Sequence, residues 1–360
     1  MKIITIVGAR PQFIKAAAVS TQLKKHYPEI KELIIHTGQH YDVNMSDIFF
    51  DQLNISEPAY NLSIGSGSHA QQTSKILEKL EAILIEEKPN IVLLYGDTNS
   101  TLGAAICASK LCIPIVHVEG GVRNTSMEIP EQVNRVLTDH VSDLIFSPTE
   151  DGMDSLKKEN LIDRAYNYGD VMLDILLLSI KKSRKESNIS EIIALPNEYY
   201  LATIHRHSNT DDVNVIKEIL NGFQSLDEKV VFLRHPRTKH KMQDYQLADE
   251  SYDNIIFHEP ISYLDMLYLV DNCKMVLTDS GGLQKEACFL EKPSVMIFDH
   301  TPWRDLENLG WIKVVKNIKA EEIVKATKNR TFKGNPIELY GNGQASYNIA
   351  KKIKEKYFTQ

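Results

Sequence analysis

The stretch VLTDSGGLQKEA, residues 276–287, describes an apolar strand that turns at a Ser-Gly-Gly corner into a helix. Gly281 and Gly282 carry no Cβ that would obstruct a close ligand, and the first N–H groups of a helix point outward at the positive end of its dipole. Ser280 adds a hydroxyl, and Glu286 accepts hydrogen bonds of the kind that sugar hydroxyls donate. The segment favours a nucleotide diphosphate joined to a ribose, and an ordinary strand-to-helix turn explains it equally well.

The same alternation of strand and helix runs along the whole chain. Short runs rich in Ile, Val and Leu, separated by longer amphipathic stretches, are typical of parallel strands that are buried on both faces. In the first half we expect strands at 3–8, 32–37, 90–96, 114–120 and 143–148, with helices at 15–26 and 68–88. In the second half we expect strands at 199–205, 229–235, 254–259, 274–279 and 292–299. The predicted class is α/β, with one architecture used twice.

A break between the two halves is expected around Tyr168 to Asp170, followed by the polar segment 181–191. A chain of 360 residues suits two domains of about 150 to 200 residues each. Two domains imply a cleft between them. Because ligands of open α/β sheets bind beyond the carboxyl ends of the strands, the chemistry is expected directly after each predicted strand.

The composition is that of a soluble globular protein, with 42% hydrophobic and 25% charged residues. A net charge of -7 argues against a nucleic-acid or anionic-membrane partner. No apolar stretch reaches the roughly 18 residues that a membrane span needs, which predicts a cytoplasmic protein. The four cysteines show no metal-ligand spacing, so we expect buried thiols with neither disulfides nor zinc.

Three carboxylates follow strands of the first half or open a helix there. Asp97 comes after the third predicted strand, Glu119 after the fourth, and Glu131 directly after Pro130 at a predicted helix start. Taken alone, Asp97 is explained equally well as the cap of the next helix. Together, opposite a cationic corner, the three carboxylates form a site able to move protons on and off carbon or oxygen.

Cations flank the first strand-to-helix turn and follow the glycine pair after the fourth strand. Arg10 and Lys15 bracket the start of the first helix, where positive charge is unfavourable unless an anion binds there. Arg123 follows two glycines that permit close approach of the backbone to a ligand.

Basic side chains also follow two strands of the second half. His205 and Arg206 come at the end of the first strand there, and we expect His205 to take part in the site and not merely to lie at the surface. The segment RHPRTKH (234–240) contains His235 and forms another basic strand end. Surface solvation and phosphate steering both explain that segment.

Seven motifs occur in the order of a known family. They are GARPQFIK (8–15), HTGQHYD (36–42), YGDTNST (95–101), HVEGGVR (117–123) with IPEQVNR (129–135), IHRHSNT (204–210), LTDSGGLQKEA (277–287) and YGNGQAS (340–346). With these motifs the chain resembles the non-hydrolysing UDP-N-acetylglucosamine 2-epimerase family from Lys2 to about Tyr347. Within the family it looks closest to the branch that acts on UDP-2,3-diacetamido-2,3-dideoxyglucuronic acid.

The resemblance implies two Rossmann-like domains in a glycosyltransferase-B-like arrangement with an interdomain cleft. The last helix is expected to return to the first domain, which gives residues 1–168 plus 345–360 to the catalytic domain and 169–344 to the UDP-binding domain. The implied protein is a homodimer with no cofactor and no metal. The implied reaction inverts C2 of a UDP-2-acetamido sugar, by anti elimination of UDP to a glycal and re-addition, in surface polysaccharide precursor synthesis.

Positions carried over from the family give the expected site. The resemblance implies that the catalytic residues are Asp97, Glu119, Glu131 and His205. It implies that UDP and the sugar are bound by Arg10, Lys15, Ser280, Gly281, Gly282 and Glu286. From their positions after predicted strands, we expect Arg123, Arg206 and His235 to bind the substrate as well. Proton transfer at C2 is assigned to Asp97 and Glu131, with Glu119 positioning or sharing the proton.

Departures from the family pattern gather where the sugar is expected. Gln132 replaces a second glutamate of the family pattern, and Ser208 replaces the glutamate of its HR-x-E-N motif. Thr301-Pro302-Trp303 replaces a Thr-Glu-Arg sequence. Glu128 replaces a frequent arginine and would repel a uronic acid if both were desolvated. A hydrolysing epimerase, a glycosyltransferase of the same architecture and a non-catalytic nucleotide-sugar sensor remain the alternatives.

Overall fold

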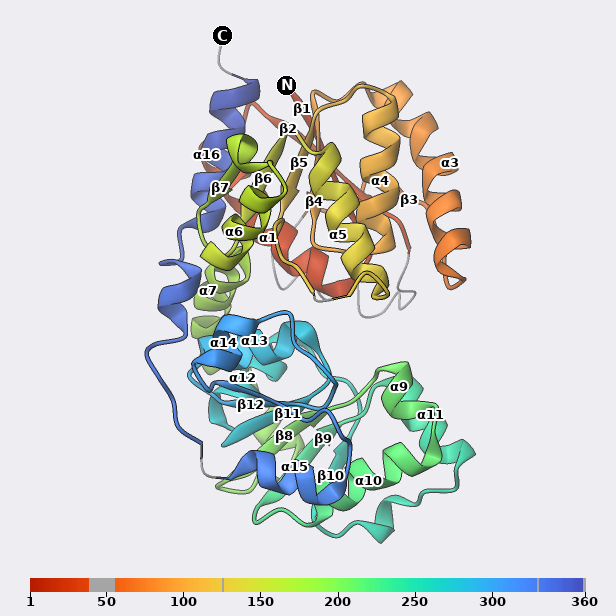
Figure 1. Ribbon diagram of the computed structural model, residues 1–360, viewed down its shortest axis with the longest axis vertical. Helices are drawn as coiled ribbons and strands as arrows, with labels where there is room; N and C mark the ends of the chain where they lie inside the picture. The colour runs from red at the N-terminus through yellow and green to blue at the C-terminus, as the bar shows by residue number, and fades with distance from the viewer. Residues whose placement is uncertain (39–55, 125, 329, 359–360) are drawn as a thin grey trace. The chain divides into compact units, whose positions relative to one another are not determined.

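The computed structural model describes residues 1–38, 56–124, 126–328 and 330–358 (Figure 1). The chain divides into two compact units, Met1–Leu177 with Glu338–Gln360, and Leu178–Ile337. The first unit contains both ends of the chain, and one helix, α7 (Val171–Glu186), runs from the first unit into the second. The motif at 36–42 lies largely outside the described residues.

The first unit is built on a parallel sheet of seven strands in the order β3-β2-β1-β4-β5-β6-β7. Its strands are β1 (Lys2–Val7), β2 (Lys31–His36), β3 (Tyr60–Asn61), β4 (Ile91–Tyr95), β5 (Ile115–Val118), β6 (Leu144–Ser147) and β7 (Ala165–Asn167). Its helices are α1 (Arg10–His26), α3 (His69–Glu87), α4 (Asn99–Lys110), α5 (Pro130–Val141), α6 (Glu150–Lys158), η1 (Ile162–Arg164) and α16 (Ala345–Tyr357), and η3 (Ile337–Tyr340) leads into α16.

The second unit is built on a parallel sheet of six strands in the order β10-β9-β8-β11-β12-β13. Its strands are β8 (Tyr199–Thr203), β9 (Lys229–Leu233), β10 (Ile255–His258), β11 (Met275–Thr278), β12 (Ser294–Met296) and β13 (Ile312–Val314). Its helices are α8 (Ile189–Ile192), α9 (His207–Thr210), α10 (Val213–Gln224), α11 (Pro236–Asp244), η2 (Asp249–Ser251), α12 (Tyr263–Asn272), α13 (Gly281–Phe289), α14 (Arg304–Asn308) and α15 (Ala320–Thr327).

The predicted α/β class with two parallel sheets is confirmed, and every predicted strand is present within a few residues of its expected bounds. The prediction missed β3, β7 and β13, which have two or three residues each and lie at the edges of the sheets. An edge strand is covered on fewer sides, so it does not need the continuous apolar run that signals a central strand.

The order of strands reverses direction in both sheets, between β1 and β4 in the first and between β8 and β11 in the second. The central strands are buried on both faces, as in β4, whose five residues are all buried. A crevice opens beyond the carboxyl ends of the strands at such a reversal, because the connections leave in opposite directions. We therefore expect a ligand of either unit at these two points.

Two expectations from composition, on the cysteines and on membrane spans, can be compared with the structure. The four cysteines are free, and Cys107, Cys273 and Cys288 are buried, but Cys112 is exposed in the turn after α4, contrary to the expectation of buried thiols. Its positive φ of 54° shows that the turn, and not an apolar core position, holds this residue. No helix of the described ranges combines the length and the apolar character needed to cross a membrane.

The C-terminal helix α16 is fastened to α7 by one buried carboxylate. Asp174 is 4% exposed and accepts hydrogen bonds from the backbone N–H groups of Ala345 (3.3 Å) and Ser346 (2.6 Å) and from the Ser346 hydroxyl (2.6 Å). These donors lie in the first turn of α16, where N–H groups have no partner within the helix. Burial raises the pKa of Asp174, and the hydrogen bonds from Ser346 and Ala345 oppose that shift.

We expect Asp174→Ala to lower the free energy of unfolding by about 2 kcal/mol, because it leaves the first N–H groups of α16 buried without an acceptor. Urea unfolding followed by circular dichroism measures the change. Asp163→Ala, at an exposed position of η1, is the matched control and should change stability by less than about 0.5 kcal/mol. Equal effects of the two substitutions would contradict the assigned role.

Candidate active site

Asp97 lies in the turn that follows β4. Gly96 adopts a φ of 65°, and the side chain of Thr98, not that of Asp97, caps α4 by accepting from the N–H of Thr101 (3.3 Å). The carboxylate of Asp97 instead forms an ion pair with Arg135 of α5. The carbonyl of Asp97 accepts from the Asn134 amide (2.8 Å). The alternative that Asp97 serves as the helix cap is therefore wrong.

Glu119 and Lys15 form a pair beside that turn. Glu119 follows β5 with a φ of 70°, and its carboxylate lies 2.5 Å from the Lys15 ammonium, with both side chains about 10% exposed. A Cβ on Gly96 would lie 3.3 Å from the Lys15 Nζ and 3.7 Å from the Glu119 Oε1. The absence of a side chain at Gly96 lets this pair approach the turn that carries Asp97, so the structure brings Asp97, Glu119 and Lys15 together.

Glu131 lies in the first turn of α5, is exposed, and takes part in none of the ion pairs found within the described ranges. Arg135 follows it by four residues, a spacing that places both side chains on one face of a helix. The face of α5 that reaches Asp97 through Arg135 thus also carries Glu131. The Nη1 of Arg135 is buried and has no hydrogen-bond acceptor among the residues that the structure describes.

Arg10 and Gln12 belong to the turn after β1. Arg10 begins α1, and its side chain lies outside the described part of the chain. Gln12, which the sequence analysis did not single out, is buried and accepts from the N–H groups of Gly8 (2.9 Å) and Ala9 (3.1 Å). Its amide donates to the Tyr95 carbonyl (2.8 Å), which ties the ends of β1 and β4 together.

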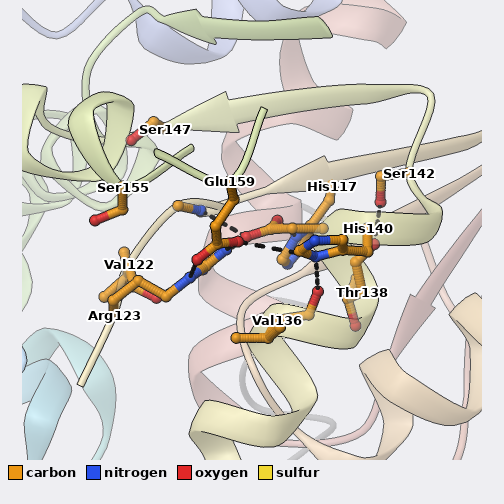
Figure 2. Close-up of polar contacts among 12 residues, drawn as sticks. His117, Val122, Arg123, Val136, Thr138, His140, Ser142, Ser147, Ser155 and Glu159 are labelled. Atoms are coloured by element: carbon orange, nitrogen blue, oxygen red, sulfur yellow. Dashed lines mark hydrogen bonds and ion pairs between the residues drawn. The ribbon is translucent and has the colours of Figure 1, made fainter. Parts of the chain in front are cut away.

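Arg123 is held by the protein itself (Figure 2). Its Nε and Nη2 donate to the two carboxylate oxygens of Glu159, each at 2.8 Å, and its Nη1 donates to the Val122 carbonyl (3.0 Å). Nη1 also lies 2.8 Å from the carboxylate of Asp139. Because these contacts use most of the guanidinium N–H groups, the structure gives Arg123 a role in holding the loop after β5, and its binding to substrate stays a prediction.

Asp139 of α5 is a buried anion that the sequence analysis missed. It is 0% exposed and contacts the His117 Nδ1 (2.6 Å), Arg123 and the Gly121 N–H (2.9 Å). Burial favours the neutral acid, but the charges of His117 and Arg123 and the hydrogen bonds outweigh it and hold the pKa of Asp139 below its usual value. The sequence contained one sign of this buried anion. His117 is a polar residue within the otherwise apolar strand β5, and a buried histidine needs a polar partner.

In the second unit, Asp279 organises the turns after β8 and β11. It is 0% exposed and accepts from the backbone N–H groups of His205 (2.9 Å) and Arg206 (2.8 Å) and from the Asn209 amide (3.0 Å). The His205 Nδ1 lies 2.8 Å from its other carboxylate oxygen. Burial opposes ionisation, but His205 and these hydrogen bonds hold the pKa of Asp279 below its usual value. Asp279 belongs to the motif LTDSGGLQKEA, but the motif alone gave no sign of this role.

The glycine corner, Ser280, Gly281 and Gly282, directly follows Asp279. Ser280 caps α13 by accepting from the Leu283 N–H (3.4 Å). A Cβ on Gly282 would meet nothing within 4 Å, and one on Gly281 would only touch the end of a glutamine side chain at 4.0 Å. The start of α13 therefore faces open space, which gives a ligand room to approach the helix N-terminus.

The buried side chains of Trp303 and Tyr263 contact α13 behind this corner. The indole N–H of Trp303 donates to the Gly281 carbonyl (2.8 Å), and the Lys285 ammonium lies 3.9 Å from the Trp303 ring centroid. Glu286 is 6% exposed and accepts from the Tyr263 hydroxyl (3.0 Å). Trp303, one of the departures from the family pattern, thus fastens a loop to the first turn of α13.

The remaining predicted residues of the second unit lie at the ends of β8 and β9. Arg206 donates from Nε to the Asp279 carbonyl (2.8 Å), and its guanidinium lies 4.0 Å from the Phe298 ring centroid. The rings of His205 and His235 are 5.6 Å apart between centroids. In the described ranges, no group of three His, Cys, Asp or Glu side chains is placed to hold a metal ion.

Comparison with known proteins identifies the family. The model of the UDP-N-acetylglucosamine 2-epimerase family matches residues 22–354. The chain belongs to this family. It is 45% identical to a UDP-N-acetylglucosamine 2-epimerase homolog of Methanococcus maripaludis, over 98% of this chain and 99% of that protein. It is 44% identical to the UDP-2,3-diacetamido-2,3-dideoxy-D-glucuronate 2-epimerase of Pseudomonas aeruginosa, again over 98% and 99% of the two chains.

Solved structures of the same epimerase family agree. The UDP-GlcNAc 2-epimerase of Methanocaldococcus jannaschii, crystallised with UDP-GlcNAc and UDP, matches with a TM-score of 0.90 at 37% identity, over 99% of this chain and 100% of that one. The enzyme of Neisseria meningitidis bound to UDP-GlcNAc matches with a TM-score of 0.85 at 30% identity, over 99% and 100% of the two chains. The predicted family and its epimerase class, an isomerase class, are confirmed.

We expect Asp279→Asn to lower the free energy of unfolding by about 2 kcal/mol at neutral pH, because it replaces a buried anion that accepts several hydrogen bonds. The folded-state pKa of Asp279 is lowered, so this stabilisation is complete above the unfolded-state value of about 3.9. It is lost as the pH falls through the folded-state pKa. Urea unfolding of both proteins from neutral to acidic pH measures the difference.

The control for this measurement is Asp271→Asn, which breaks a surface pair with the largely exposed Arg184. It should cost less than about 1 kcal/mol. A difference between the wild-type protein and Asp279→Asn that stays constant as the solution is acidified would show that the ionised carboxylate of Asp279 is not its source.

Proposed function

We propose that this protein inverts C2 of a UDP-linked 2-acetamido sugar and returns a UDP-linked product. The observation that carries the proposal is the cluster at the strand reversal of the first unit, where Asp97 and Glu119 are each paired with a buried cation. Membership of the epimerase family supports it, as does the open glycine corner at the strand reversal of the second unit.

The nucleotide is assigned to the second unit. The N-terminus of α13 offers N–H groups and the positive end of a helix dipole to a diphosphate, and the glycines leave the approach open. Arg206 and His235 lie on neighbouring strand ends of the same sheet and supply positive charge or hydrogen bonds. Glu286, held by Tyr263, is assigned to the ribose hydroxyls.

The reaction proceeds by elimination and re-addition. A carboxylate removes the proton from C2, the C1–O bond breaks with its electron pair leaving on UDP, and a double bond forms between C1 and C2. An acid then returns a proton to the opposite face of C2 while the diphosphate oxygen attacks C1. We assign the two proton transfers to Asp97 and Glu131, because α5 presents Glu131 on the face whose Arg135 contacts Asp97.

The paired cations support these roles by holding the carboxylates in place. Arg135 contacts Asp97, and Lys15 contacts Glu119. The proton at C2 is only weakly acidic, so stabilisation of the leaving diphosphate must lower most of the barrier. We assign the stabilisation of the charge on the leaving diphosphate to the N-terminus of α13, His205 and Arg206.

The sugar is a 2-acetamido sugar, and the relatives leave two classes open for it. The Methanocaldococcus jannaschii enzyme is crystallised with UDP-GlcNAc, and the Pseudomonas aeruginosa relative is named for a diacetamido uronate. Glu128, expected to repel a uronate, is exposed, so water screens its charge and this objection is weaker than the sequence suggested. Both UDP-GlcNAc and the diacetamido uronate therefore belong in the assay.

A hydrolysing epimerase is the second candidate, and the deuterium assay described below distinguishes it from the proposed reaction. Surface polysaccharide synthesis and a homodimer, which the resemblance implies, stay predictions. The cytoplasmic location expected from the lack of a long apolar stretch stays a prediction as well.

Incubation with each UDP-sugar in deuterated water, followed by NMR, tests the proposal. The expected product is still UDP-linked, is inverted at C2 and carries deuterium there, because the returning proton comes from a group that exchanges with solvent. Free sugar with UDP would indicate the hydrolysing reaction. Unchanged starting material with every sugar would contradict both and favour a non-catalytic binding protein.

Asp97→Asn should lower the rate of deuterium incorporation by at least about 100-fold, since it removes a group that transfers the proton. UDP affinity, measured by calorimetry, should remain within about twofold because Asp97 lies in the other unit from the glycine corner. Asp154→Asn, an exposed position of α6, is the control and should behave like the wild-type enzyme. Retained exchange in Asp97→Asn would remove Asp97 from the mechanism.

Gly282→Ala tests the diphosphate assignment. The added Cβ meets no protein atom within 4 Å, and alanine in a helix is favoured over glycine by about 0.5 to 1 kcal/mol, so the variant should be at least as stable as the wild-type protein. UDP binding should weaken at least about tenfold, a loss of about 1.4 kcal/mol, because the methyl group occupies the approach to the helix. The control is Gly67→Ala in the first unit. Unchanged UDP affinity in Gly282→Ala would place the diphosphate elsewhere.

A further inference from the structure

His117 lies between two acceptors and has no contact with solvent. Its side chain is 0% exposed, its Nδ1 lies 2.6 Å from the Asp139 carboxylate, and its Nε2 lies 2.7 Å from the Gly96 carbonyl. A neutral imidazole has one N–H donor and one acceptor nitrogen, and a carbonyl oxygen only accepts. The nitrogen facing Gly96 therefore carries a proton, and the nitrogen facing Asp139 requires a shared proton as well.

The surroundings of Asp139 decide which group holds that second proton. Its other oxygen lies 2.8 Å from Arg123 and accepts from the Gly121 N–H at 2.9 Å, contacts that favour an ionised carboxylate. The proton then belongs to His117, which is doubly protonated. The positive charges of His117 and Arg123 are balanced by the negative charges of Asp139 and Glu159, which lowers the cost of burying these four groups.

The second hydrogen bond of His117 reaches the turn that carries Asp97. The Gly96 carbonyl and the Asp97 N–H belong to one planar peptide unit, so a donor that fixes the oxygen also fixes the direction in which Asp97 leaves the strand. Gly96 has a φ of 65°, a conformation that glycine adopts without cost and leaves without cost. The turn therefore depends on an external contact to hold its orientation.

We propose that His117, as a buried imidazolium held by Asp139 and Arg123, is a positioning residue that fixes the Gly96–Asp97 peptide and thereby the placement of the Asp97 carboxylate. The inference rests on the proposed function. Arg135 holds the carboxylate of Asp97, and Asn134 holds its carbonyl. His117 supplies the third point of attachment, on the peptide that precedes Asp97. Three points are enough to fix the side chain relative to the reacting carbon, and a shift of 1 Å costs about 100-fold in rate.

Two substitutions separate this role from a general effect of the buried charge. In His117→Gln, the amide nitrogen takes approximately the place of Nε2, so it still donates to Gly96 but loses the contact with Asp139. In His117→Asn, the amide nitrogen takes approximately the place of Nδ1, so it keeps Asp139 and loses Gly96. Both variants remove the same positive charge.

We expect His117→Asn to lose at least about tenfold more kcat than His117→Gln, with KM within about twofold of the wild-type value in both. Urea unfolding of the variants shows how far their stabilities differ. Equal losses of kcat, a larger loss in His117→Gln, or losses confined to KM would overturn the positioning role, because each would mean that the Gly96 contact does not set the placement of Asp97.

NMR of the wild-type chain provides a test that does not depend on turnover. Selective 15N labelling of histidine, with the signal assigned by its absence from the spectrum of His117→Gln or of whichever variant folds, is expected to show protons on both ring nitrogens of His117 at neutral pH. A neutral tautomer would overturn the proposal. If the wild-type protein shows no epimerase activity but His117 is doubly protonated, the proposed function fails while the buried imidazolium stands.

Discussion

A buried carboxylate needs hydrogen-bond donors or cations around it, and each unit of this protein is organised by one such group. Asp139 in the first unit and Asp279 in the second are fully buried, and each accepts a backbone N–H from the turn after a strand. Each also faces a histidine, His117 or His205. The requirement to satisfy these anions holds the strand-end turns in one conformation.

The sheet topology determines where the polar groups of each unit gather. Parallel strands bring their carboxyl ends to one edge, and the reversal of strand order leaves that edge open in each unit. In the first unit the edge carries the pairs Lys15–Glu119 and Arg135–Asp97. In the second it carries the glycine corner at the start of α13. In the proposed function, chemistry on carbon and binding of an anion take place at two different sheets of the same kind.

Much of this was predictable because its signals are local. The strands β1, β4, β5 and β11 are buried on both faces, so their residues form short, mostly apolar runs. The strand-end positions of Asp97 and Glu119 follow from the runs of β4 and β5. The edge strands β3, β7 and β13 have no such run and were missed. Cys112 was expected to be buried because its neighbours in sequence are apolar, but the turn conformation exposes it.

The pairing of charges was not predictable, because it joins residues far apart in the chain. Lys15 and Glu119 are separated by 104 residues, Asp97 and Arg135 by 38, and His117 and Asp139 by 22. Lys15 and Arg123 were therefore expected to bind a ligand, whereas in the structure each is paired with a carboxylate.

Hydrophobic periodicity and short motifs depend only on neighbouring residues. The α/β class, the repetition of a parallel sheet, the family and the strand ends at which the polar residues gather could therefore be inferred without coordinates. The tertiary structure alone decided which cation neutralises which carboxylate and which buried side chains hold the turns. Those choices depend on distances of a few ångströms between strands and helices, and such distances exist only once the chain has folded.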